Sequence, residues 1–330
     1  MEPTTLQEAI VYFSKPENCR EYLVARRWPN GVTCPRCGSQ NVLFLEKYNR
    51  WHCREKHDAP QFTLKTGTIF EDSPIGLDKW LTAMWQIVNC KNGISSYEVH
   101  RAIGITQKSA WFMDHRIRLA LGEGDTGKMS GHCEVDETFI GGKARNMHMD
   151  VKKRRITGSG PVDKTPVMGI LERGDDCKPK DRKKHSKVVT IVVPNRRKKT
   201  LQNEVKANVQ AGAALYSDAL LSYDGLESEY AHKVVDHAVE YVRGKVHTNG
   251  LENFWSLTKR SINGTYVSVE PFHLFRYLDE QSFRFNNRGT QKVPVTDSQR
   301  FDMAVRQIVG KRLTYKELTG KTQESANQPF

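Results

Sequence analysis

The sequence predicts an α/β protein in which a mixed sheet follows a small cysteine-rich domain and a helical domain. Apolar segments of strand length, between about residues 130 and 290, alternate with amphipathic segments of helix length. Two pairs of metal-ligand residues lie near the N-terminus. The 330 residues are enough for two or three domains, and their formal net charge of +13 favours a polyanionic partner.

The first expected domain, residues 1–72, contains a metal site. Cys34 and Cys37 form a Cys-x2-Cys pair, and Cys53 and His57 follow after an alternating segment that predicts a β-hairpin. Thiolates with imidazole suit tetrahedral Zn²⁺, which would supply folding energy to so small a domain. His52 is a competing fourth ligand, because Cys-x3-His is a less usual spacing. The pattern predicts a zinc ribbon.

The second expected domain, residues 73–125, is helical. Apolar residues recur at helical spacing in "IGLDKWLTAMWQIVNC" and predict a core helix. Ser95 or Ser96 can cap a short helix ending near Ile103, and Thr106 can cap a longer one through Leu121. Helix, glycine turn and helix is the helix-turn-helix pattern, which would present Gln107 and Lys108 to DNA. An ordinary helical hairpin remains the alternative.

The third expected domain, residues 130–290, is the α/β core. The order of elements is three strands, a helix, a strand and further helices, which is the order of a ribonuclease-H-like core. The expected segments are "HCEVDETFIGG", "KTPVMGILE", "KVVTIVVPN", the helix "TLQNEVKANV", the strand and helix of "AALYSDALLSYDGL", and helices after Thr248 and Pro271. Residues 291–330 are expected to be a polar, partly disordered tail.

The basic residues are concentrated in one stretch. Residues 143–199 contain 18 lysines and arginines against 6 acidic residues, in runs such as "KKRR" and "RRKK". Such runs attract phosphates irrespective of base sequence, although solvated loops are the simpler interpretation. No apolar run is long enough to span a membrane and no signal peptide is recognised, so a cytoplasmic protein is expected. No nucleotide-binding loop is found.

Three carboxylates could form an active site. Asp136 lies within the first strand of the core, Asp218 ends a later strand, and Glu252 lies in the first turn of a helix. Carboxylates suit Mg²⁺, and two such ions would serve an in-line phosphoryl transfer. Lys259 lies on the same helical face as Glu252, about two turns on. Asn249 and Glu252 also have the spacing of a capping box, so a capping role for Glu252 stays open.

In combination, the motifs resemble those of bacterial insertion-sequence transposases of the DDE type. The segments that carry the resemblance are "EVDETFIGG", "KTPVMGILE", "SDALLSYDGL", "HTNGLENFWSLTKRSINGTY" and "HLFRYLDEQSFRFNNR", and "CPRC…WHC…TGTIF" is similar to the subgroup with an N-terminal zinc ribbon. The resemblance implies Mg²⁺-dependent (or Mn²⁺-dependent) cleavage and joining of DNA at terminal inverted repeats, with two ions held by Asp136, Asp218 and Glu252. Asn249 is the alternative third ligand.

The same resemblance implies target DNA as a partner, a homodimer or higher oligomer on paired ends, and association with the bacterial nucleoid. Arg284 and Arg288 are expected either to contact DNA or to solvate a helix end. Glu134 and Glu137 are expected on the sheet face opposite Asp136. Two other functions stay open: a DNA-binding regulator with a degenerate catalytic fold, and a host nuclease that cuts without joining.

Overall fold

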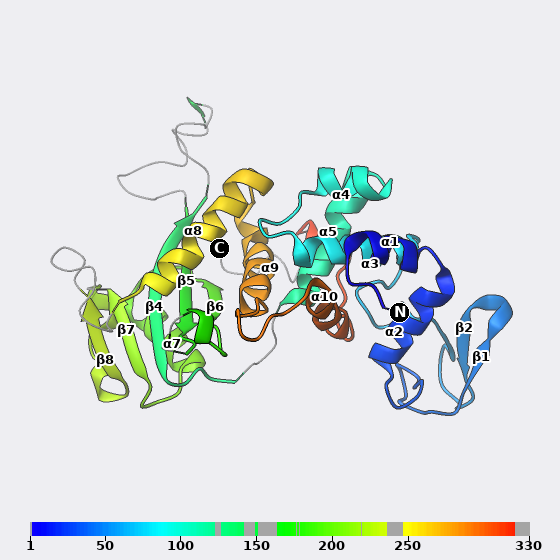
Figure 1. The fold of residues 1–330 in the computed structure, drawn as a ribbon, viewed down its shortest axis with the longest axis horizontal. Coiled ribbons are helices and arrows are strands. Elements are labelled where there is room, and N and C mark those ends of the chain that lie inside the picture. The colour runs from blue at the N-terminus through cyan, green and yellow to red at the C-terminus, as the bar shows by residue number, and fades with distance from the viewer. Residues whose placement is uncertain are drawn as a thin grey trace. The chain divides into compact units, whose positions relative to one another are not determined.

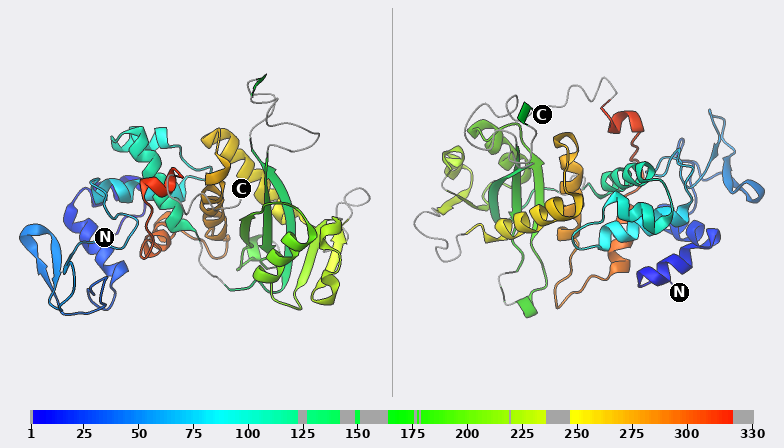
Figure 2. Two further views of the ribbon diagram at one scale, coloured as in Figure 1. Left: turned by 180° about the vertical axis from the view of Figure 1, so that it is seen from behind. Right: turned by 90° about the horizontal axis from the view of Figure 1, so that it is seen from above.

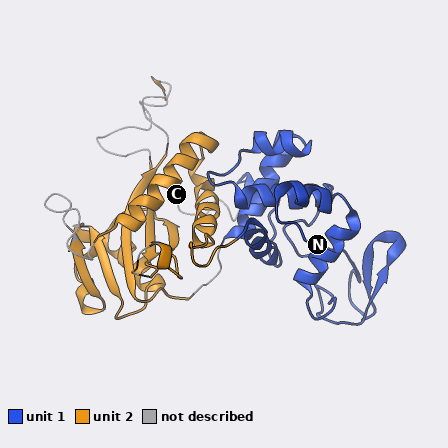
Figure 3. Ribbon diagram, in the orientation of Figure 1, with its two compact units in different colours: residues 1–122, 296–327 blue, residues 123–295, 328–330 orange. Residues whose placement is uncertain are grey.

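The computed structural model describes residues 2–122, 127–141, 149–150, 164–175, 177, 179–218, 220–235 and 247–320. It divides into two compact units, one formed by residues 1–122 with 296–327 and the other by residues 123–295 with 328–330 (Figure 3). None of the helices in the described ranges is long and apolar enough to cross a membrane.

The first unit begins with two helices that the sequence analysis did not predict, followed by a three-stranded antiparallel sheet (Figure 1). Thr5 caps the first helix in a reciprocal capping box with Glu8, and Pro16 starts the second. Cys19 is buried in the second helix, outside the metal-ligand pattern. The elements are α1 (Leu6–Phe13), α2 (Pro16–Arg27), β1 (Val42–Leu45), η1 (Glu46–Tyr48), β2 (Arg50–Cys53) and β3 (Gln61–Phe62).

Three helices follow, where the sequence predicts them: α3 (Leu77–Asn89), α4 (Ser96–Ile103) and α5 (Gln107–Leu121). The side chain of Ser95 caps α4, and that of Thr106 caps α5. Gly104 ends α4 at φ +62°, a backbone conformation that glycine adopts without strain. The caps and the turn residue therefore set the boundaries of this helical pair.

The expected polar tail instead forms part of the first unit. Residues 297–306 form α10 (Asp297–Arg306) and residues 315–318 form α11 (Tyr315–Leu318). Phe301 is fully buried and its ring lies 5.8 Å from that of Phe13 and 4.9 Å from that of Trp85. The polar composition of this segment led to the prediction of a tail rather than a helix, because only one face of α10 carries apolar residues.

The second unit is built on a five-stranded sheet in the order β6-β5-β4-β7-β8. The first three strands along the chain pair antiparallel, β7 pairs parallel with β4, and β8 pairs parallel with β7. The strands are β4 (His132–Ile140), β5 (Thr165–Glu172), β6 (Lys187–Val192), β7 (Ala214–Asp218) and β8 (Ala231–Val235). The sequence analysis missed β8, and the helix expected after β7 is replaced by two short 3₁₀ turns, η4 (Leu221–Tyr223) and η5 (Leu226–Ser228).

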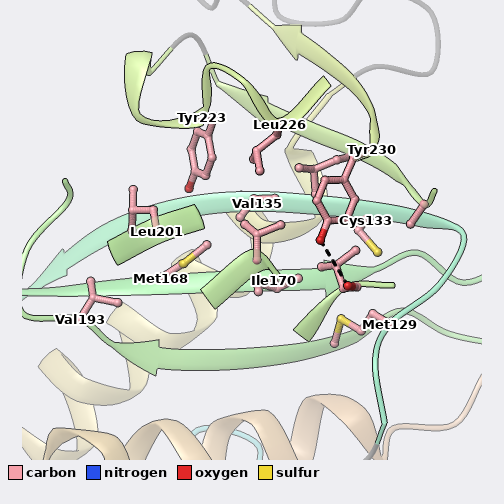
Figure 4. Packing of buried hydrophobic residues seen from close by; sticks show 14 residues of the cluster. Met129, Cys133, Val135, Met168, Ile170, Val193, Leu201, Tyr223, Leu226 and Tyr230 are labelled. Carbon is pink, nitrogen blue, oxygen red and sulfur yellow. Dashed lines mark hydrogen bonds between the residues drawn. The ribbon is translucent and has the colours of Figure 1, made fainter. Parts of the chain in front are cut away.

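One face of this sheet is covered by α7 (Lys198–Asn208) and the two 3₁₀ turns. Val135, Met168 and Ile170 point into an apolar cluster with Leu201 and Tyr223 (Figure 4). The opposite face carries α8 (Asn249–Ser261) and α9 (Leu274–Asn286), whose apolar residues pack on alternate positions of β4, β5 and β6 (Figures 1 and 2). The remaining short elements are η3 (Pro179–Asp181), a π-turn η6 (Ile262–Tyr266) and η7 (Pro271–His273).

Candidate active site and zinc centre

Asp136 and Asp218 both lie just beyond the paired stretch of the neighbouring strands β4 and β7. The last paired residues of the parallel strands β4 and β7 are Glu134 and Tyr216, and each aspartate lies two residues beyond them. Side chains two residues apart share a face of a strand. Because Glu134 contacts α8, both aspartates belong to the α8-covered face. Parallel pairing of strands that are far apart in sequence thus brings the two carboxylates together.

Helix α8 brings Glu252 to the same face. Leu251, Phe254 and Trp255 are buried against the sheet, whereas Glu252 is exposed one residue after Leu251. The approach is close at Gly169 on β5, where an added Cβ would lie 2.6 Å from the Trp255 ring. A glycine in this strand is therefore required for the helix to sit at its observed height.

The electrostatics of Asp136 agree with a cluster of carboxylates. Burial, together with the charges of Asp218 and Glu252, raises its pKa to about 6. Two hydrogen bonds oppose this shift: the amide of Glu137 donates to Oδ1 (2.8 Å), and the indole Nε1 of Trp255 donates to Oδ2 (3.1 Å). A divalent cation would relieve the repulsion, so the all-oxygen donor set fits a hard ion such as Mg²⁺.

The start of α8 differs from the capping box that the sequence suggested. Asn249 is the first helical residue, so it is not the N-cap. The N-cap is Thr248, whose side chain makes no capping hydrogen bond. The motif misled because its spacing depends on where the helix begins, and that boundary lies one residue earlier than expected. Lys259 is exposed on the same face as Glu252, about 10 Å further along the helix.

Glu134 and Glu137 correct another expectation. Glu137 lies on the face opposite Asp136, as predicted, and accepts a hydrogen bond from the hydroxyl of Tyr223. Glu134 shares the face of Asp136, because residues two apart on a regular strand point the same way. Its carboxylate accepts a hydrogen bond of 3.0 Å from the amide of Leu251 on α8.

The four expected zinc ligands come together in the first unit. Their ligand atoms, from Cys34, Cys37, Cys53 and His57, all lie within 4.8 Å of one another. The Cys34 Sγ to His57 Nε2 and Cys37 Sγ to Cys53 Sγ distances are both 3.6 Å. Tetrahedral thiolate ligands at about 2.3 Å from zinc would lie roughly 3.8 Å apart, so the cluster fits structural Zn²⁺.

His57 rather than His52 completes the cluster of candidate zinc ligands. The Nδ1 of His57 lies 2.8 Å from the carbonyl oxygen of Asp58, and donation to this oxygen leaves Nε2 free to bind metal. His52 follows the buried Trp51 on β2 and precedes Cys53, so strand alternation directs it to the opposite face. Spacing alone could not decide between the two histidines.

The chain matches two family models: an ISXO2-like transposase domain over residues 128–286 and a transposase zinc-ribbon domain over residues 15–55. An uncharacterized transposase-like protein of Haemophilus influenzae is 34% identical over 102 residues, which are 31% of this chain and 82% of that protein. An uncharacterized protein in transposable element ISH50 of Halobacterium salinarum is 26% identical over 278 residues, which are 81% of this chain and 89% of that protein. No solved structure matches.

The chain belongs to the ISXO2-like transposases. Among the residues of this transposase expected to contact DNA, Lys108 is exposed at the start of α5, with its Nζ 4.8 Å from the centroid of the Tyr315 ring. Gln107 is half-buried, and its side-chain nitrogen donates to the hydroxyl of Ser96 on α4. Gln107 therefore helps to hold the helical pair together.

The structure contradicts a DNA contact for Arg284. This residue is 8% exposed and pairs with the fully buried Glu280 four residues earlier on α9. Arg288 is half-buried, with its guanidinium 3.4 Å from the centroid of the Phe285 ring. Position near a helix end suggested exposure, but the end of α9 packs on β6 and buries its charges.

His237 and the basic run "KKRR" at residues 152–155 lie outside the described residues. His247 lies two residues before α8, where Arg173 contacts both its ring and its carbonyl. Arg173 and the buried role of Glu134 were not predicted from the sequence. Glu134 had a local signal, because it is an ionisable residue between the apolar Cys133 and Val135 on a strand. Arg173 had none, because it follows the last residue of β5 and stands between Glu172 and Gly174.

Proposed function

We propose that this transposase binds the terminal inverted repeats of its insertion sequence, cleaves DNA strands there and joins them to target DNA in a Mg²⁺-dependent reaction. The proposal is supported by the positions of Asp136 and Asp218, which lie just beyond the paired stretch of β4 and β7, and by the charges of Asp218 and Glu252, which act on Asp136. The order of three antiparallel strands followed by two parallel ones supports a ribonuclease-H-like core.

Asp136, Asp218 and Glu252 would hold two Mg²⁺ ions, or Mn²⁺ ions, by their carboxylate oxygens. When bound, such ions activate the attacking oxygen and stabilise the leaving oxygen of an in-line phosphoryl transfer. Asp136 is oriented for this by the Glu137 amide and the Trp255 indole. Lys259, two turns along α8, is placed to contact a phosphate of the bound strand.

Glu252 is preferred over Asn249 as the third ligand for an electrostatic reason. The charge of Glu252 contributes to the raised pKa of Asp136, so this carboxylate lies close enough to Asp136 to interact with it electrostatically. Asn249 is exposed in the first turn of the same helix and stays the alternative. We further propose that the zinc ribbon and the α4–α5 pair recognise the terminal repeat, with Lys108 contacting DNA, and that two or more copies assemble on paired ends.

The test is a cleavage and joining assay on a duplex that carries the element's end, with Mg²⁺. We compare the wild type with Asp136→Ala, Glu252→Gln and Asn249→Ala, and measure binding to the same duplex in parallel. Asp136→Ala should neither cut nor join while binding normally. Loss of activity in Glu252→Gln but not in Asn249→Ala identifies the glutamate as the third metal ligand, and the reverse result identifies the asparagine.

Other outcomes of this assay would replace the proposal. A wild type that binds the end without cutting it would be a regulator. A wild type that cuts without joining would be a nuclease. Normal joining by Asp136→Ala would remove Asp136 from the active site altogether.

A further inference from the structure

Glu134 is a buried carboxylate that the reaction outlined above does not use. It lies two residues before Asp136 on β4, on the same sheet face, and its side chain is 1% exposed. Its Oε1 accepts a hydrogen bond of 2.7 Å from Nε of Arg173 and lies 3.6 Å from Nδ1 of His247. Its Oε2 accepts the amide of Leu251 at 3.0 Å. Burying a carboxylate costs free energy unless it is paired and hydrogen-bonded, so these contacts are what keep Glu134 inside the unit.

The bond to Leu251 satisfies an amide in the first turn of α8. The first amides of a helix lack partners within the helix, and a nearby negative charge is favourable there. Thr248 does not cap α8 with its side chain, so the carboxylate arrives from the neighbouring strand instead. Glu134 thereby joins the strand that carries Asp136 to the helical turn that carries Glu252.

Gly250 is what admits the carboxylate to this position. A Cβ at residue 250 would lie 2.7 Å from Oε2 of Glu134, closer than two such atoms can approach. Alanine is otherwise the better residue in a helix. The glycine therefore lowers the helix propensity of α8 but allows the contact between α8 and Glu134.

Arg173 completes the connection from the other side. It follows the last residue of β5, and its Nη2 donates to the carbonyl oxygen of His247 and lies 2.9 Å from the ring Nδ1. Its guanidinium also lies 4.5 Å from the ring centroid of Tyr216 on β7. One side chain thus links β5, β7 and the residue that leads into α8.

We infer that Glu134, held by Arg173, is a positioning residue for Glu252, the proposed third metal ligand of the active site. By fixing the Leu251 amide, it sets the height and rotation of the first turn of α8, and so the place of Glu252 relative to Asp136. The inference rests on the proposed function of these two carboxylates. A displacement of about 1 Å at a catalytic centre can cost on the order of 100-fold in rate.

The test uses a substitution that leaves Glu134 itself in place. In the full chain, Gly250→Ala displaces the carboxylate, and Gly264→Ala is its control, because a Cβ at residue 264 meets nothing within 4 Å. We expect Gly250→Ala to lower the cleavage rate at the element's end by about 100-fold and to raise the Mg²⁺ concentration needed for half-maximal cleavage. Gly264→Ala should change neither quantity.

A second pair of variants separates positioning from general loss of stability. Glu134→Ala removes both contacts, whereas Glu134→Gln keeps an acceptor for Leu251 and should recover part of the Mg²⁺ response. Glu280→Gln removes the charge from another buried ion pair, with Arg284 on α9, and serves as the control at matched burial. We expect Glu134→Ala and Glu280→Gln both to lower Tm, and only Glu134→Ala to shift the Mg²⁺ dependence.

Three outcomes decide the inference. An unchanged Mg²⁺ dependence in both Gly250→Ala and Glu134→Ala overturns it and leaves Glu134 a stabilising residue. An equal shift in Glu280→Gln also overturns it, because the effect would then follow stability alone. Full cleavage by Asp136→Ala overturns both the inference and the proposed function, whereas an inactive Asp136→Ala together with the first of these outcomes overturns the inference only.

Discussion

The indole Nε1 of Trp255 donates a hydrogen bond of 3.1 Å to Oδ2 of Asp136. Trp255 is 4% exposed and packs in the apolar layer between α8 and the sheet. The same side chain therefore has two roles. Its ring fills the core, and its single polar atom orients a carboxylate of the proposed active site.

Replacing Trp255 with phenylalanine separates these roles. The variant keeps an aromatic ring and loses the donor, so we expect a modest loss of stability, about 1–2 kcal/mol, from the hydrogen bond and the smaller ring. The cleavage rate should fall by roughly tenfold or more, because the orientation of Asp136 is lost. Trp80→Phe is the control, since its indole donates to the Ser73 hydroxyl in the other unit. Equal cleavage by the two variants would contradict an orienting role.

The metal-free protein should lose stability as pH rises, in part because of Glu137. Burial, followed by the charges of Asp218 and Asp136, raises the pKa of this carboxyl to about 8 from a reference of 4.5. The folded chain therefore keeps a proton that the unfolded chain releases. That contribution to stability is complete below pH about 4.5 and is lost as pH rises through about 8.

Glu137→Gln tests this titration. In EDTA, the variant should gain Tm relative to the wild type at pH 8.5 and show little or no gain at pH 4.5, because glutamine carries no charge at either pH. Glu270→Gln, which changes an exposed carboxylate of the same unit, is the control. A gain in Tm that is the same at both pH values would show that the effect of residue 137 is not one of ionisation.

The zinc centre predicts different behaviour for two neighbouring histidines. His57→Ala removes a ligand of the cluster and should lower zinc content and the stability of the ribbon, since metal binding supplies much of the folding energy of such domains. His52→Ala should keep one zinc per chain. Zinc release measured with a colorimetric chelator, alongside thermal unfolding, checks both. Loss of zinc from His52→Ala alone would reverse the assignment.

Helix α10 should stabilise the first unit although it lies near the end of the chain. Phe301→Ala empties a fully buried site between aromatic rings and should cost about 3–5 kcal/mol. Met303→Ala on the same helix is the control, because Met303 is 36% exposed. Urea unfolding of both variants measures the difference. Similar midpoints would show that α10 is not part of the folded core.

Local signals predicted much of the element structure. Ser95, Gly104 and Thr106 mark the boundaries of α4 and α5 because capping and a left-handed turn depend on a few adjacent residues. Alternation predicted β4, and short apolar segments predicted β5 and β6, because strand patterning is also a property of adjacent residues. The start of α8 was misplaced by one residue. The side chain that accepts a hydrogen bond from its first turn belongs to Glu134, which lies 117 residues away in the sequence.

The sequence by itself determined the family, the types of residue in the zinc cluster and the helical pair, because each depends on short-range spacing or on a combination of motifs. The role of the three carboxylates stays a prediction. Only the tertiary structure decided that His57 completes the zinc cluster, that Arg284 is buried, that α10 joins the first unit and that Glu134 faces α8. Each of these depends on which distant segments pack together. Burial and long-range pairing are properties of the folded chain, and no local pattern records them.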